Sequence, residues 1–339
     1  MLDSLRLSNG LFAKVSRFVL ICSALAVAVQ AGRVVGQDAA ARSAYRRLAP
    51  GVMTVIPPQL EAEETFSGPR PMVELLESSP DLKWDPKTLA PSETLYQMAQ
   101  DVVYRRTIWG LEFSFKPMRI IEAPVRTPNG NITTQSVHYL VYYVKNTGGQ
   151  LQPSRDENKT YNIEQADGTL RFFPTFVLKT HDTDSEASLD QVLPEAVEMI
   201  RRREDPRRKL YDSVSISSLA IPVSTEFEDN SVWGVATWTN IDPHSDFFSV
   251  FIQGLTNAYR WEDKDGGYRA GEPPMTGREF TYKTLQLNFW RPGDSVENRE
   301  DEIRFGVPNP NQVPPSKRGD DILRRYGLQE RVDYLWVYR

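Results

Sequence analysis

The sequence predicts a mainly β protein, an antiparallel β-sandwich with two or three peripheral helices and Pro-rich extensions. Three observations support this prediction. From about residue 106 to residue 294, short runs are rich in β-branched and aromatic residues, a composition that fits half-buried pleated strands. Turn signals such as Thr127–Gly130 separate the runs, and most connections are too short for the crossover helices of a parallel sheet. The chain is 40% hydrophobic and 11% aromatic, which is enough for a packed core in 339 residues.

The individual strands follow from the alternation of apolar and polar residues. Val137–Lys145 is apolar on both faces, which predicts a central strand covered on each side. Pro174 predicts that its strand lies at an edge or a bulge, because proline cannot donate to a ladder. Val232–Thr239 and Phe247–Tyr259 are expected to pair as a hairpin joined by Asn240–Asp246, and this hairpin is expected to organise the sandwich. The predicted strands cover residues 109–115, 118–125, 137–145, 170–179, 213–223, 232–239, 247–259, 280–290 and 332–338.

The number and spacing of these strands fit a Greek-key sandwich of the immunoglobulin-like type, although paired cysteines around a core tryptophan are absent. Ser92–Tyr104 has one apolar face and predicts a helix. A second helix is predicted at Ser188–Arg203, where Ser188 and Gln191 would form a capping box. A short helix is expected at Asp320–Tyr326. The apolar strand that follows it is expected to add to a sheet edge, because a free strand of this kind would aggregate.

Residues 1–31 have the pattern of a cleaved signal peptide. Lys14 and Arg17 precede an apolar run, and small residues at Val29–Ala31 suit a signal peptidase. An uncleaved anchor is the alternative, but an apolar run of about 14 residues is shorter than the ~20 of a spanning helix. We therefore expect an exported protein, periplasmic or extracellular, without a transmembrane span in the mature chain.

The remaining chain divides into three parts by composition. Residues 32–91 are expected to form a leader and a Pro-rich segment that wraps over the domain, with Trp84 as its anchor. Residues 92–295 would form the β-sandwich domain, with the helix at 188–204 inserted in it. Residues 296–339 would form a tail with a short helix and the terminal strand.

Charge and cysteine content exclude several classes of function. The formal net charge is −5 and no basic face is evident, so nucleic acid is not an expected partner. Cys22 is the single cysteine and lies in the predicted signal peptide. A cleaved chain would therefore have no disulfide, no thiol nucleophile and no Cys-ligated zinc, a composition typical of the bacterial envelope.

Two polar clusters could hold metal ions. His181 and His244, with Asp242 and Asp246, could form a zinc site for metal-assisted hydrolysis if the fold brought them together, with Asp182 and Asp184 near them. No HExxH-type spacing supports this site, and ordinary turn chemistry of Asp and Ser side chains is the alternative.

Asp263 and Asp265 lie in a stretch with the oxygen density of a calcium loop. The stretch does not match the EF-hand template, since Tyr268 stands where the template requires glycine. A surface hairpin loop is the alternative to the calcium site. No cofactor other than Ca²⁺ is expected.

The sequence contains no nucleophile elbow, no Walker pattern and no dinucleotide fingerprint. Its seven tryptophans could instead form a platform for sugar rings. Trp109, Trp233 and Trp290 lie in strand patterns, where core packing explains them. Trp261 and Trp84 are the better candidates for the rim of a ligand site.

Five strand segments resemble a group of exported bacterial proteins of uncharacterised function. They span much of Arg106–Asp294 and comprise LEFSFKPMRII, YLVYYVKNTGG, FFPTFVLKT, VWGVATWTNIDP and TLQLNFWRPGD. The resemblance implies an immunoglobulin-like β-sandwich of the envelope or periplasm. It implies no activity and no catalytic residues.

The leading hypothesis is a non-catalytic exported protein, structural or interaction-mediating, whose partner is an unknown protein or polysaccharide of the cell envelope. The first alternative is a carbohydrate-binding or carbohydrate-active envelope protein, which requires exposed aromatic rings beside a carboxylate cleft. The second alternative is a metal-dependent hydrolase, which requires His181 and His244 to lie close together.

Overall fold

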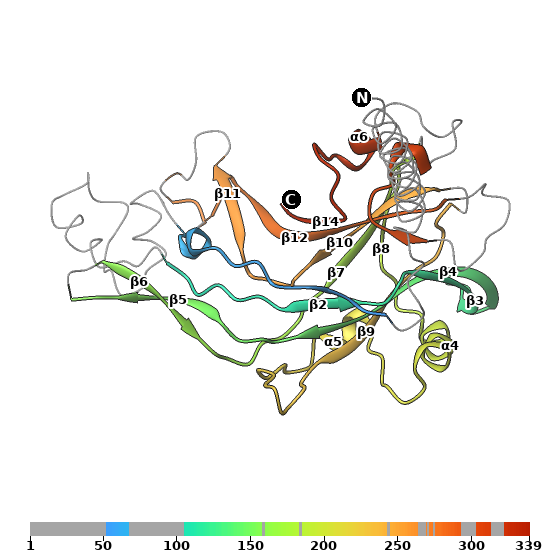
Figure 1. Cartoon of the computed structure of the whole chain (residues 1–339), viewed down its shortest axis with the longest axis horizontal. Coiled ribbons are helices and arrows are strands. Elements are labelled where there is room, and N and C mark those ends of the chain that lie inside the picture. Colours follow the sequence, from blue (N-terminus) through green and yellow to red (C-terminus); the bar gives the residue numbers. More distant parts are fainter. Residues whose placement is uncertain are drawn as a thin grey trace, which may run out of the picture. The chain divides into compact units, whose positions relative to one another are not determined.

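A computed structural model of the chain describes residues 52–67, 105–157, 160–182, 185–242, 245–263, 269, 271–273, 275–292, 303–312 and 322–339. These residues belong to one compact unit, residues 50–339. The predicted signal peptide, the helix at Ser92–Tyr104, Trp84, His244 and Asp265 lie outside the described residues. Within them the fold is mainly β, with antiparallel sheets and a few short helices, as predicted (Figure 1).

The first sheet is built around one long strand. β4 pairs with β3 and β2 along one side and with β9 along the other, and β1 extends the sheet beyond β2. From Val137 to Tyr142 every β4 residue is buried, which confirms the predicted central strand. The strands of this sheet are β1 (Thr54–Ile56), β2 (Glu112–Phe115), β3 (Arg119–Arg126), β4 (Ile132–Lys145) and β9 (Val232–Trp238).

The second sheet has the order β11-β12-β10-β7-β8, and β13 and β14 also pair with β12. The terminal strand β14 therefore adds to this sheet, as its apolar sequence predicts. Pro174 precedes β7, and β7 lies between β10 and β8, so the predicted edge position is wrong. The strands are β7 (Thr175–Thr180), β8 (Ala187–Leu189), β10 (Phe247–Gln253), β11 (Tyr259–Asp263), β12 (Arg278–Trp290), β13 (Arg304–Phe305) and β14 (Tyr334–Tyr338).

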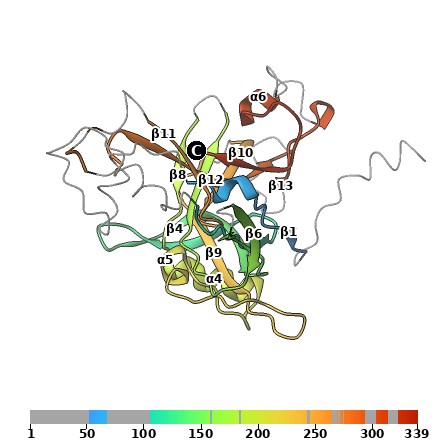
Figure 2. The ribbon, with the colours of Figure 1, turned by 90° about the vertical axis from the view of Figure 1, so that its left-hand side faces the viewer.

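The main core lies between the two sheets and is rich in aromatic rings. Tyr142 of the first sheet and Phe176 of the second lie 4.9 Å apart, centroid to centroid, and both are fully buried. Trp238 is fully buried in the same layer. Alternate residues of the facing strands fill this layer, which gives the two-layer packing of a β-sandwich. A separate hairpin, β5 (Gln150–Arg155) with β6 (Tyr161–Ala166), extends from the chain between β4 and β7 (Figure 1), and Figure 2 shows β6 from a second side.

Short helices cover the outer faces. α4 packs against β3 over a second apolar cluster, and its Glu204 side chain is buried among Lys116, Arg119 and the hydroxyl of Tyr139. α6 covers Phe247 and Trp290 on the outside of the second sheet. The helices are η1 (Ala62–Thr65), α4 (Pro194–Glu204), α5 (Ser213–Ile216), η2 (Pro310–Gln312) and α6 (Ile322–Tyr326), of which α6 lies where a short helix was predicted.

The start of the inserted helix differs from the prediction. Ser188 belongs to β8, which pairs with β7, and α4 begins at Pro194 after an N-cap residue, Leu193, that makes no side-chain cap. The predicted capping box of Ser188 and Gln191 therefore does not form. Pairing with β7 keeps residues 187–189 extended, and proline at the first helical position sets the new start.

The strand predicted at 213–223 is also wrong over its first half. The Asp212 side chain accepts hydrogen bonds from the backbone of Val214 and Ser215, which starts the short helix α5. Only single bridges follow, from Ile221 to Leu170 and from Val223 to Asn146.

The predicted hairpin of residues 232–259 does not form. β9 pairs with β4 in the first sheet, whereas β10 pairs with β7 and β12 in the second. The connection after β9 therefore crosses the sandwich from one sheet to the other. Trp238 and Phe248 face the shared core from opposite layers, which explains why both strands look equally buried in the sequence.

Candidate functional site

A groove of about 830 Å³ lies between η1 and the ribbon formed by β11 and the first half of β12. Aromatic rings of Phe66, Tyr259, Trp261 and Tyr338 line it together with acidic side chains. Arg260 is the one basic side chain among the described residues that line the groove. The acidic residues of the lining are Glu61, Glu63, Glu64, Glu262, Asp263 and Glu279.

A break in the second sheet sets the position of the groove. β10 ends just before Gly254, whose φ of 95° is a conformation that favours glycine. A Cβ atom at this position would lie 2.2 Å from the carbonyl oxygen of Phe173. After this break, the carbonyl of Ala258 accepts a hydrogen bond from the N–H of Lys283 in β12. The separate strand β11 begins at the next residue, Tyr259, and also pairs with β12. The strand predicted over Phe247–Tyr259 is thus interrupted in the middle.

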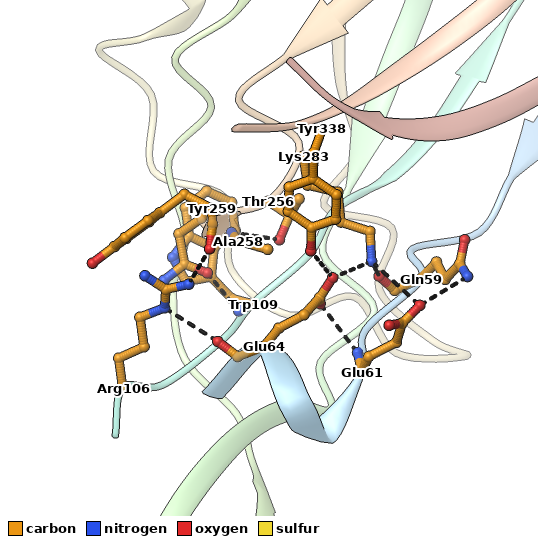
Figure 3. A network of polar contacts seen from close by, with 11 residues as sticks. Gln59, Glu61, Glu64, Arg106, Trp109, Thr256, Ala258, Tyr259, Lys283 and Tyr338 are labelled. Atoms are coloured by element: carbon orange, nitrogen blue, oxygen red, sulfur yellow. Dashed lines mark hydrogen bonds and ion pairs between the residues drawn. The ribbon is translucent and has the colours of Figure 1, made fainter. Parts of the chain in front are cut away.

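A buried ion pair fastens η1 to this ribbon (Figure 3). The Lys283 ammonium bonds to the Glu64 carboxylate at 2.5 Å, with 2% and 4% of the two side chains exposed. Lys283 also donates to the carbonyl of Gln59, and the Tyr338 hydroxyl donates to Glu64. Burial and the Glu64 carboxylate raise the pKa of Tyr338 well above its usual range, so its hydroxyl stays a donor.

Arg106 fixes the opposite end of η1. Its guanidinium donates to the carbonyl of Glu64 at 3.2 Å and to the carbonyl of Tyr259 at 2.8 Å, and it lies 3.4 Å from the centre of the Tyr259 ring (Figure 3). Nearby, the Asn257 side chain bonds to the backbone of Trp109 and Thr107. The two walls of the groove are therefore held by side chains rather than by a continuous sheet.

Trp261 lies on β11 and is half-buried, with the Arg278 guanidinium 3.5 Å from its ring centre. The same guanidinium bonds to the Asp263 carboxylate at 2.8 Å and has a side-chain exposure of 1%. Asp263, one of the two predicted calcium ligands, thus holds an internal arginine. Asp265 lies outside the described residues, and the calcium site remains a prediction.

His181 lies at the end of β7 and is buried against the Tyr326 ring of α6. Its Nε2 atom is 2.8 Å from the Ser249 hydroxyl, which donates to the Asn288 amide oxygen at 2.8 Å. Because Ser249 donates to Asn288, we assign the His181 Nε2 atom as a donor to the Ser249 oxygen. Ser249 is fully buried. Desolvation, and then the charge of Lys179, lower the pKa of His181 to about 4.

Among the remaining residues of the predicted zinc site, Asp182 and Asp246 lie next to each other. Asp246 is buried and its N–H donates to the Asp182 carboxylate at 3.1 Å, while Asp242 is exposed. Burial, followed by the nearby Asp246 carboxylate, raises the pKa of Asp182. In the described part of the chain no group of three or more His, Cys, Asp or Glu side chains is placed to hold a metal. A metal site here would depend on His244, which lies outside that part.

The sequence prediction identified Trp261 as a rim residue but missed most of the groove. Its residues come from four separate segments, 61–66, 259–263, 279–281 and 338, and no local pattern joins them. One signal was present: Lys283 lies inside a predicted strand, and a buried lysine requires a partner carboxylate.

Comparison with known proteins assigns no relative to this chain: no family model, no curated protein and no solved structure matches it. None of the helices that the structure describes is both long and apolar enough to cross a membrane. A function must therefore be argued from the groove itself.

Proposed function

We propose that this protein is a non-catalytic, exported interaction protein whose acidic groove binds a basic, Lys- or Arg-bearing segment of a partner protein. The observation that carries the proposal is the excess of carboxylates over cations along the groove. Glu64 and Asp263 hold internal cations, Lys283 and Arg278, and Arg260 is the cation of the lining. Glu61 lies 4.0 Å from the same Lys283, and with Glu63, Glu262 and Glu279 it makes carboxylates more numerous than basic side chains in the lining.

The ribbon itself places two of these carboxylates face to face. Glu262 of β11 lies directly opposite Glu279 of β12, and both side chains are exposed. Like charges in such a pair destabilise a sheet by a few tenths of a kcal/mol or more. Both carboxylates would attract a cation bound over this pair, which favours a basic ligand over a neutral one.

The aromatic rings of the groove already stack on guanidinium groups of the chain. Arg106 lies over Tyr259, Arg278 over Trp261 and Arg260 over Tyr338, at distances of 3.4, 3.5 and 3.9 Å. Aromatic faces attract cations through their quadrupole, most strongly where water is excluded. The groove thus combines the two features, carboxylates and aromatic faces, that recognise arginine and lysine side chains.

The test uses a fluorescent oligo-arginine peptide and an acidic peptide of equal length, titrated with the protein by anisotropy. The variant Glu262→Lys/Glu279→Lys reverses the charge of the ribbon. The control Glu164→Lys/Glu226→Lys makes the same change in charge at exposed positions on β6 and in the loop before β9.

We expect the groove variant to bind the basic peptide at least about tenfold more weakly than the control. Equal affinities of the two variants would mean that binding depends on net charge alone and would refute the proposal. Failure of the wild-type protein to prefer the basic peptide over the acidic one would refute it as well.

Carbohydrate binding is the second candidate, favoured by one observation. Trp261 is half-buried and, with Tyr338, lines the same groove as the carboxylates, an arrangement suited to a sugar ring that stacks and hydrogen-bonds at once. Calorimetric titration with neutral envelope oligosaccharides distinguishes the two candidates. Binding that Trp261→Ala abolishes and Glu262→Lys/Glu279→Lys preserves would favour the sugar.

We further propose that the sandwich is of the immunoglobulin-like type. The strand order supports this: β2-β4-β9 in one sheet and β8-β7-β10-β12 in the other follow the order A-B-E and C′-C-F-G of that topology. The resemblance of the strand segments to exported bacterial proteins and the signal-like residues 1–31 support export to the periplasm or the cell exterior.

A further inference from the structure

The outer edge of β14 has no partner strand among the described residues. β14 lies along β12 (Figure 1), and Tyr282 and Arg339 exchange both backbone hydrogen bonds. Because an antiparallel ladder alternates, the next residues that bond to β12 are every second one, down to Asp333, whose carbonyl accepts from Asn288. Tyr334, Trp336 and Tyr338 therefore direct their N–H and C=O groups away from β12.

An edge with three outward-pointing residues is a template for another strand. In the described part of the chain, no backbone hydrogen bond reaches Tyr334, Trp336 or Tyr338 from this side. Tyr334 is 38% exposed, and the four residues that follow it in β14 are half-buried. The edge is thus apolar, regular and open to a strand of similar length.

The sequence of this edge is complementary to itself. Around Trp336 the residues are arranged symmetrically: Leu335 and Val337 are aliphatic, and Tyr334 and Tyr338 flank them. The outermost pair carries opposite charges, Asp333 before the strand and Arg339 after it. The seven-residue segment DYLWVYR therefore presents matching side chains when it meets a second copy in the antiparallel direction.

We propose that two copies of this protein pair through β14, antiparallel, around a two-fold axis that passes at Trp336. In this register Tyr334 lies opposite the partner's Tyr338, and Asp333 lies opposite the partner's Arg339. All outward-pointing residues then meet each other, so every free N–H and C=O group of the edge gains a partner. The contact is isologous, so it closes as a dimer and does not propagate.

This inference does not rest on the proposed function, since the substitutions Glu262→Lys and Glu279→Lys leave β14 unchanged. Loss of peptide binding without loss of dimerisation, or the reverse, tells which of the two ideas fails.

The decisive experiment is sedimentation velocity of the full chain over a concentration series up to about 100 µM, a range over which a weak dimer becomes populated by mass action. Asp333→Arg and Arg339→Asp each place like charges opposite one another twice in the dimer. The double variant restores attraction with the charges exchanged. We expect the wild type to dimerise, each single variant to dissociate at least about tenfold more readily, and the double variant to recover.

A second pair of variants tests the backbone contact. Tyr334→Pro removes an outward N–H group at the first residue of β14, a position that tolerates proline, and leaves the bonds to β12 intact. Tyr334→Ala removes the same side chain but keeps the N–H group. The proline variant should dimerise more weakly than the alanine variant, while thermal unfolding shows that both are folded.

Three results would overturn the proposal. The first is a wild-type protein that stays monomeric at every concentration. The second is a dimer that is insensitive to the charge exchanges, which would locate the interface elsewhere. The third is equal dimerisation of the two Tyr334 variants, which would exclude backbone pairing at this edge.

Discussion

The buried pair of Lys283 and Glu64 offers the sharpest test of how the groove is held together. Its two side chains are 2% and 4% exposed, so neither charge is compensated by water. Removing one partner of a buried pair costs about 3–5 kcal/mol, because the remaining charge stays buried. Total stability of a domain is about 5–15 kcal/mol, so such a loss is readily measured.

Glu64→Gln and Lys283→Met differ in what they leave behind. After Glu64→Gln, Lys283 keeps the carbonyl of Gln59 at 2.8 Å, and the new amide oxygen can still accept from Tyr338. We therefore expect Glu64→Gln to lower the free energy of unfolding by about 3 kcal/mol, the lower end of that range. After Lys283→Met, Glu64 keeps the Tyr338 hydroxyl and the N–H of Glu61, and a loss of similar size is expected.

The double variant Glu64→Gln/Lys283→Met has no buried charge. Its loss of unfolding free energy, measured by urea denaturation, should be smaller than the sum of the two single losses by about 2 kcal/mol or more, since neutral replacement of a buried pair is often tolerated. Hydrogen exchange of residues 61–66 should increase in both single variants. Losses below about 1 kcal/mol in the single variants, or strictly additive effects, would refute the reasoning.

Three further predictions concern acid stability, the break in the second sheet and export. Burial, followed by the charge of Arg291, lowers the pKa of His138 to about 3, and His181 has a pKa of about 4, so both are neutral when folded and protonate near pH 6.5 when unfolded. The contribution of the two neutral histidines to the free energy of unfolding is complete above about pH 6.5 and falls as the pH decreases toward 4 and 3. At about pH 5 the loss is about 2 kcal/mol for each histidine. His181→Gln, which retains a donor near Ser249, should flatten the slope of unfolding free energy against pH, and an unchanged slope would contradict this. Gly254→Ala should destabilise the protein by about 2 kcal/mol or more in urea denaturation, through strain and the clash with Phe173. Gly130→Ala, also at positive φ but with open space around it, should cost only about 1 kcal/mol, and equal losses would exclude the clash. Mass spectrometry of the protein from the host envelope should show an N-terminus at Gly32, and an intact Met1 would contradict the signal peptide.

The groove shows how far sequence reasoning reached toward a site. Trp261 was proposed as a rim residue because it stands beside an acidic stretch, and in the structure it lines the groove and is half-buried. Its neighbours Glu64 and Tyr338 could not be found, since the segments that carry them meet only after the second sheet has formed. The predicted histidine site stays a prediction: His181 contacts Ser249 inside the sheet, and His244 lies outside the described residues.

The sequence by itself determined where most strands lie, because burial on one or both faces leaves a local pattern in the residues, as in β4, β12 and β14. It also determined the short helix at Ile322–Tyr326. Only the tertiary structure decided which strands pair. β9 and β10 are adjacent in the chain and similar in composition, yet they lie in opposite sheets, because a strand's own residues specify its burial and not the identity of its neighbour. The groove and the open edge of β14 arise from those pairings, so their positions could be known only once the strands were placed.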